Sequence, residues 1–190
     1  MKLKQSRDEL ERAKQTVEKI KNSDSLDEYE ELWKDFLHYL EKTWIKAERE
    51  CQGFKNKFMP WQGKFKNLRR KDPLLKYLKN ARDADVHSIQ EITKKGKSSV
   101  TGNFVNPSGG YIEKMVIKNG VIEEYKGDPI IFEFSPGFVK AISFFNNNLL
   151  YDIPNYHRGE KVKNPDNPTE LAELGIKFYA DYLDKIEKEF

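Results

Sequence analysis

The sequence has one cysteine, Cys51, among its 190 residues. A single cysteine excludes a disulfide within the chain and any metal site built from several thiolates. No apolar run approaches the roughly 20 residues of a membrane span, and the first residues, MKLKQSRDELERAK, lack the apolar segment of a signal peptide. We therefore expect a cytoplasmic protein that does not enter a membrane, with Cys51 as a structural or incidental thiol.

Histidine is also scarce, with three residues at positions 38, 87 and 157. Their wide spacing, without clustered carboxylates, gives no metal-binding signature. Gly109-Gly110 lacks the further glycine and the helix of a nucleotide-binding fingerprint. The sequence therefore predicts neither a metal nor a cofactor, and we interpret His38 and His157 as a helix-edge residue and a loop residue.

Charge of one sign is not in large excess. The 34 basic and 31 acidic residues leave a net charge of +3, which does not by itself mark a nucleic-acid-binding protein. Aromatic residues, by contrast, make up 13% of the chain. So many rings require a core, and the length suits one domain over residues 1–190.

Apolar side chains recur every three or four residues in four stretches, which predicts four helices. The first spans residues 1–22, and the second runs from a cap at Asp24 or Ser25 to about Cys51. The third begins with Asp72 as its cap and Pro73 as its first residue, and fades near residues 94–96. The last covers residues 168–190 with Thr169 as its cap.

The middle of the chain has β-strand character. Residues 111–117 and 121–125 flank Asn119-Gly120, the strongest short signal for a hairpin. Residues 130–134 and 139–145 give two further strands, whereas 52–71 and 146–168 contain glycine, proline or asparagine and are predicted to be irregular.

These elements predict a mainly α fold with a small antiparallel β appendage. About four helices form a bundle, and a hairpin or meander of three or four strands is inserted before the last helix. We expect one domain with a helical part over residues 1–95, a β insertion over 109–146 and a closing helix over 168–190.

One stretch of the third helix carries groups that can do chemistry: Asn80-Ala81-Arg82-Asp83-Ala84-Asp85-Val86-His87. Arg82 and His87 are five residues apart, about 140° of rotation and about 7.5 Å of rise, so their long side chains can converge over a groove. An imidazole can take a proton from a ribose 2′-hydroxyl. A guanidinium can hold a phosphate and offset the charge that develops on it. A carboxylate can orient either group.

The stretch resembles the motif of HEPN families, in which an arginine and a polar residue precede a histidine by a few positions. Arg82-Asp83-Ala84-Asp85-Val86-His87 has this form. The resemblance implies a homodimeric, metal-independent endoribonuclease of toxin or defence systems, with single-stranded RNA as substrate and an antitoxin or other protein as partner. Arg82 and His87 would be catalytic with Asp83 beside them, and Asn80 and Asp85 would support them.

A second interpretation needs no catalysis. The same residues can form a polar helix face, with Lys79–Asp83 and Arg82–Asp85 at the spacing of intrahelical ion pairs. The protein would then be an interaction or dimerisation protein.

A third interpretation concerns residues 54–71, where cations alternate with aromatic side chains. Such a segment can bind RNA, with rings stacked on bases and Lys64, Lys66, Arg69 and Arg70 on phosphates. We favour the alternative that the rings dock the segment onto the bundle while the cations stay in water.

Overall fold

The computed structural model describes residues 2–87 and 91–190, without the side chain of His87. It confirms the predicted fold class: the described residues form five α-helices, a short 3-10 helix and short antiparallel strands, and the strands precede the last helix. The chain divides into two compact units. We call Met1–Lys95 with Val139–Phe190 the helical unit, and Gly96–Phe138 the β unit.

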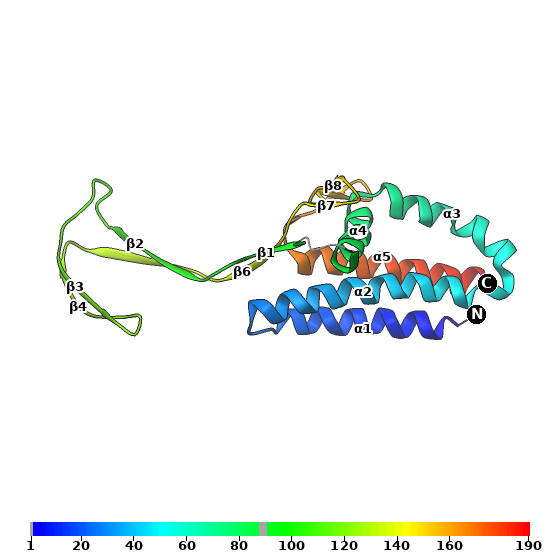
Figure 1. Cartoon of the computed structure of the whole chain (residues 1–190), viewed down its shortest axis with the longest axis horizontal. Coiled ribbons are helices and arrows are strands. Elements are labelled where there is room, and N and C mark those ends of the chain that lie inside the picture. The colour runs from blue at the N-terminus through cyan, green and yellow to red at the C-terminus, as the bar shows by residue number, and fades with distance from the viewer. Residues whose placement is uncertain (1, 88–90) are drawn as a thin grey trace. The chain divides into compact units, whose positions relative to one another are not determined.

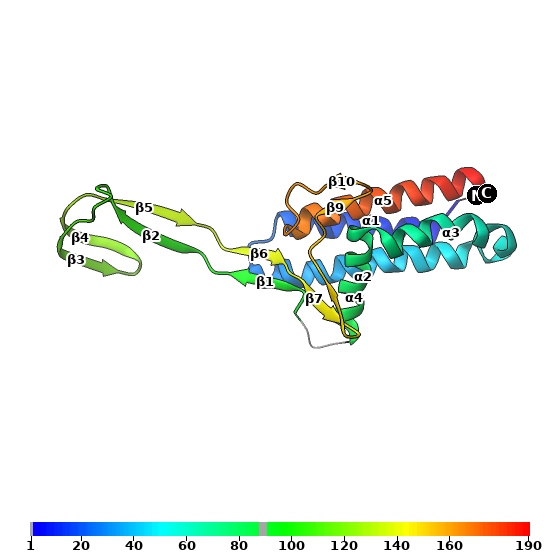
Figure 2. The same cartoon turned by 90° about the horizontal axis from the view of Figure 1, so that it is seen from above.

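Three long helices form the centre of the helical unit. α1 (Lys4–Lys21), α2 (Leu26–Glu50) and α5 (Pro168–Glu189) lie side by side in both views (Figure 1, Figure 2). Their inward stripes bury large rings, including Trp33, Phe36 and Tyr182. Burial of these apolar faces is the main source of stability for such helices.

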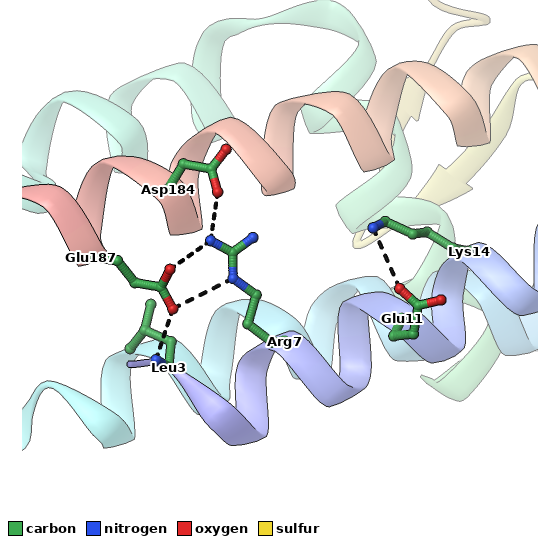
Figure 3. A network of polar contacts seen from close by, with 6 residues as sticks. All are labelled: Leu3, Arg7, Glu11, Lys14, Asp184 and Glu187. Carbon is green, nitrogen blue, oxygen red and sulfur yellow. Dashed lines mark hydrogen bonds and ion pairs between the residues drawn. The ribbon is translucent and has the colours of Figure 1, made fainter. Parts of the chain in front are cut away.

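Polar contacts join α1 to α5 near the two chain ends (Figure 3). The guanidinium of Arg7 donates to Glu187 at 2.8 Å and also to Asp184. Glu187 accepts a further hydrogen bond from the backbone N–H of Leu3, at 2.9 Å. Because one carboxylate receives donors from both the backbone and a side chain of the N-terminal segment, it fixes the start of α1 against the last turns of α5.

Helix caps agree with two of the three predictions. The Ser25 hydroxyl accepts from the N–H groups of Asp27 and Glu28, and Asp72 accepts from the N–H of Leu75 at 3.0 Å. The third prediction is wrong: Asn167, not Thr169, caps α5. Pro168 follows as the first helical residue, a position that suits proline, so α5 begins at the predicted residue 168 although its cap lies two residues before Thr169.

The sequence predicted that residues 52–71 are irregular, and this prediction is wrong. They form a short 3-10 helix, Gln52–Phe54, and then α3 (Lys55–Lys71), which contains Pro60 and Gly63. Phe58 and Phe65 are buried and pack on rings of α5 and on Phe190. Tertiary packing of this apolar face outweighs the low helix propensity that Pro60 and Gly63 impose.

The third predicted helix ends earlier than expected. α4 spans Pro73–His87, and Thr93–Gly96 is strand β1, paired with β6 (Phe138–Ala141). The pairing joins segments more than 40 positions apart, which local periodicity cannot reveal. Residues 88–90, which fall within the predicted helix, lie outside the described residues.

The β unit contains two antiparallel ribbons. β3 (Ile112–Lys118) and β4 (Val121–Gly127) form the predicted hairpin, and Asn119 and Gly120 both have positive φ, as its two-residue turn requires. β5 (Ile130–Ser135) pairs with β2 (Ser99–Phe104), a strand that the sequence analysis missed. No residue of this unit is buried.

Two small hairpins of the helical unit cover most of the connection that the sequence predicted as irregular. β7 (Phe144–Asn146) pairs with β8 (Leu149–Tyr151), and β9 (Tyr156–His157) pairs with β10 (Glu160–Lys161). Their turns use Asn147, Asn148 and Arg158 with positive φ. Asparagine tolerates this conformation, so the asparagine-rich sequence forms turns there.

None of the helices in the described ranges combines the length and the apolar character needed to cross a bilayer.

Candidate functional site

α4 carries the predicted motif and is fixed at both its start and its inner face. Leu74, Leu75, Leu78 and Ala81 are buried, and the hydroxyl of Tyr77 donates to the carbonyl of Ile142 at 2.8 Å. With these residues inside, the positions Lys76, Asn80 and Asp83 follow one another along a different stripe, at spacings of four and three residues. The sequence of the helix therefore separates an anchoring face from a polar face.

Arg82 and Asp83 are in direct contact. Arg82 Nη1 donates to Asp83 Oδ1 at 3.0 Å, and Lys79 Nζ donates to Asp83 Oδ2 at 2.8 Å. Partial burial alone would raise the pKa of the Asp83 carboxyl, but these two hydrogen bonds outweigh it and the pKa lies below its usual value. Asp83 is thus an anion at neutral pH and fits the role of orienting the guanidinium.

Arg82 retains hydrogen-bonding capacity. Its side chain is about one-quarter exposed, and its Nε is buried with no hydrogen-bond partner among the described residues. Because Nε is buried, a phosphate would be bound through the terminal nitrogens of the guanidinium, one of which Asp83 already orients.

The carboxylate of Asp85 contacts α2 rather than Arg82. Its Oδ2 is 3.4 Å from His38 Nε2 and its Oδ1 is 3.9 Å from Lys34 Nζ, so it contacts α2. The structure therefore gives Asp85 partners other than Arg82, the residue that helical spacing predicted. His38 is a histidine near the motif that the sequence analysis did not include, because nothing in the sequence shows which turn of α2 packs on α4.

His87 is the last residue of α4, and its side chain lies outside the described residues. Its position in the helix follows Asn80 by seven residues, or about two turns, which places its backbone on the stripe of Asn80 and Asp83. Asn80 itself is half-buried, donates to the carbonyl of Lys76 at 2.7 Å and contacts the side chain of Asn146.

The four predicted RNA-binding cations lie on α3 but in different surroundings. Lys64 and Arg70 are exposed, and Lys66 pairs with Glu48 at 3.1 Å. Arg69 is buried, pairs with Glu41 and lies over the Trp44 ring, 4.3 Å from its centroid. The structure thus separates Arg69 from the water-exposed set.

The aromatic residues of the same segment pack inward. Phe58 and Phe65 are buried, and Phe54 and Trp61 pack against the core. This agrees with the favoured alternative, in which the rings dock the segment onto the bundle. Base stacking on Phe58 or Phe65 would require them to leave the core.

Cys51 and His157 have structural surroundings. Burial raises the pKa of the Cys51 thiol to about 12, so the thiol stays protonated at neutral pH and is a poor nucleophile. His157 Nδ1 lies 3.0 Å from Asp72 Oδ1, and the N–H of Arg158 donates to Asp72 Oδ2 at 2.6 Å. The β9–β10 turn thus binds the residue that caps α4.

Within residues 2–87 and 91–190, no group of three or more histidine, cysteine, aspartate or glutamate side chains could hold a metal ion. Comparison of the chain with protein-family models, curated proteins and solved structures found no match.

Proposed function

We propose that this protein is a HEPN-like endoribonuclease that cleaves single-stranded RNA without a metal, by attack of a ribose 2′-hydroxyl on the adjacent phosphate. The observation that carries the proposal is the Arg82–Asp83 contact on the helix that ends in His87. It supplies a guanidinium whose Nη1 is oriented by a carboxylate.

Each residue has a separate role in the proposed reaction. His87 takes the proton of the 2′-hydroxyl and gives a proton to the departing 5′-oxygen. Arg82 binds the phosphate oxygens and offsets the charge that grows on them in the transition state. Asp83 is a positioning residue, because it holds Arg82 and does not exchange protons at neutral pH. The products carry a 2′,3′-cyclic phosphate and a 5′-hydroxyl.

The test is cleavage of single-stranded RNA in EDTA by the full chain and by Arg82→Ala, Arg82→Lys and His87→Ala. We expect the two alanine variants to lose cleavage at least 100-fold, since each removes a group that acts in the transition state. Arg82→Lys should also lose most activity, because an ammonium lacks the planar fork of a guanidinium.

Arg12→Ala is the matched control. Arg12 shares the carboxylate of Glu9 with Lys46, just as Arg82 shares Asp83 with Lys79. Both substitutions therefore leave a carboxylate with one lysine partner. Full activity in Arg12→Ala with loss in Arg82→Ala supports catalysis, whereas equal activity in all variants refutes it.

A second candidate function, a non-catalytic interaction protein, is favoured by one observation. The Lys79–Asp83 ion pair is the contact that a purely structural polar face predicts. The same cleavage assay separates the two functions. We also propose that the protein acts as a homodimer, with RNA as substrate and an antitoxin or other protein as regulator. Sedimentation of the purified chain at micromolar concentration tests the homodimer.

A further inference from the structure

A cavity of about 450 Å³ opens within the helical unit, between α2, α3, α4 and β8. Five cationic side chains line it: Lys66, Arg69, Arg70, Lys76 and Lys79. The other lining residues are Trp44, Asn80 and Tyr151, and no aspartate or glutamate is among the described residues that line it. Such a lining selects an anionic ligand.

Arg69 is a buried part of this lining. Its side chain is 8% exposed and pairs with Glu41, and its Nε is buried without a hydrogen-bond partner in the described part of the chain. A buried donor with no acceptor costs about 1–3 kcal/mol. An acceptor brought by a ligand would remove this cost.

The positive charges of Arg70 and Lys76 in the cavity have no carboxylate partner among the described residues. Three lining cations have carboxylate partners: Lys66 with Glu48, Arg69 with Glu41 and Lys79 with Asp83. Within the described residues, Arg70 contacts the neutral Asn67 and Lys76 lies over the Tyr151 ring. Both are exposed, so a ligand can reach them.

Both aromatic side chains that line the cavity already pack against another ring and a cation. Trp44 stacks on Tyr182, with ring centroids 4.6 Å apart, and also lies under Arg69. Tyr151 stacks on Phe144 at 5.6 Å and also lies under Lys76. Since both rings hold cations, they orient charge rather than offer a face to a nucleobase. The lining therefore fits a phosphate better than a base.

Two further hollows adjoin the cavity. One shares Lys66 and Arg70 with it and adds Lys64. The other shares Lys76 and Tyr151 with it and adds Lys71, together with the carboxylate of Asp152. Cations thus continue on both sides of the cavity, a distribution that suits a chain of phosphates as well as a single one.

We propose that this cavity is a phosphate-binding site, in which Arg70 and Lys76 contact the phosphate oxygens and Arg69 donates from below. The phosphate belongs either to a free nucleotide or to an RNA strand. The site requires neither Arg82 nor His87, so it goes beyond the proposed nuclease activity and can be tested without it.

The test measures binding by the full-length protein to two probes. The first is a fluorescent single-stranded 2′-O-methyl RNA, which lacks the free hydroxyl needed for self-attack, and the second is AMP in a titration calorimeter. We expect Arg70→Gln with Lys76→Gln to weaken binding at least tenfold. For the RNA probe, loss of two phosphate contacts should make the slope of log K against log salt shallower by about 1.4.

Lys55→Gln with Lys57→Gln is the matched control. It removes the same charge from exposed positions at the other end of α3, roughly 20 Å of helix rise away, and should leave affinity within twofold. Binding of AMP alone assigns the site to a free nucleotide, and binding of RNA alone assigns it to the strand. The proposal is overturned if neither probe binds, or if the two double variants lose affinity equally while circular dichroism shows both folded.

Discussion

The helical unit and the β unit differ in how far their apolar side chains are exposed to solvent. In the helical unit, Trp33, Phe36 and Tyr182 are inaccessible to solvent, whereas in the β unit Val100 is 64% and Phe134 is 69% exposed. Both units contain apolar residues, but only the helices are arranged in layers that cover one another. The difference teaches that a core requires a second packed element, which a two-stranded ribbon does not have.

The two units also differ in how their charged side chains are paired. The described carboxyls whose pKa is lowered all lie in the helical unit: Asp27, Glu30, Asp72, Asp83, Glu170 and Glu187. The β unit has exposed cross-strand pairs such as Lys114–Glu124 and Lys126–Glu113. Exposed pairs contribute little to stability, so the acid sensitivity of the fold should come from the helical unit.

The largest expected effect contrasts one ring from each unit. Trp33→Ala should lower the free energy of unfolding by about 3–5 kcal/mol, because it opens a cavity in the core. Phe134→Ala should change it by no more than about 0.5 kcal/mol, because the ring is already in water. Urea unfolding followed by far-ultraviolet circular dichroism measures both. Similar losses in the two variants would show that the β unit is part of the cooperative core.

An intermediate effect concerns Asp72, the cap of α4. Burial alone would raise the pKa of this carboxyl, but hydrogen bonds from His157 and from the N–H groups of Arg158 and Leu75 lower it below its usual value. A lowered pKa gives stability that is present above the unfolded-state value of about 3.9 and is lost as pH falls through the folded-state value.

Asp72→Asn keeps a cap acceptor but removes the charge. Its stability should therefore fall less steeply than that of the native chain between about pH 4 and pH 2, as measured by urea midpoints across that range. Asp72→Ala removes the cap as well and should cost about 1–3 kcal/mol at pH 7. Parallel pH profiles for the native chain and Asp72→Asn would contradict this role.

The smallest expected effect is that of removing the β unit. Replacement of residues 97–137 by a short glycine-serine linker removes no buried side chain, so the free energy of unfolding of the helical unit should change by no more than about 1 kcal/mol. Chemical denaturation followed by tryptophan fluorescence measures the change, since Trp33, Trp44 and Trp61 all lie in the helical unit. A loss of several kcal/mol would mean that the ribbons stabilise the helices.

Local signals in the sequence predicted most of the helical unit. The stripes of α1, α2 and α5, the Ser25 and Asp72 caps and the Asn119-Gly120 turn all act through near neighbours, which a sequence displays directly. α3 was missed because Pro60 and Gly63 weaken the helix locally. Phe58 and Phe65 stabilise it through contacts with Phe190 and α5, which lie far along the chain. β1 and β2 were missed because their partners lie far along the chain.

The candidate site was predictable to a smaller extent. The motif itself and the Lys79–Asp83 pair follow from spacing on one helix. The His38–Asp85 contact and the cavity that Arg69 lines depend on how α2, α3 and α4 pack together. Residues from three helices meet there, and no local pattern encodes their meeting.

Analysis of the RNA ends by mass spectrometry, after incubation with the full chain in EDTA, tests the central claim most directly. The account predicts 2′,3′-cyclic phosphate and 5′-hydroxyl ends that accumulate with the native protein and with Arg12→Ala but not with Arg82→Ala. Ends that carry a 3′-hydroxyl and a 5′-phosphate, or equal cleavage by Arg82→Ala, would contradict it.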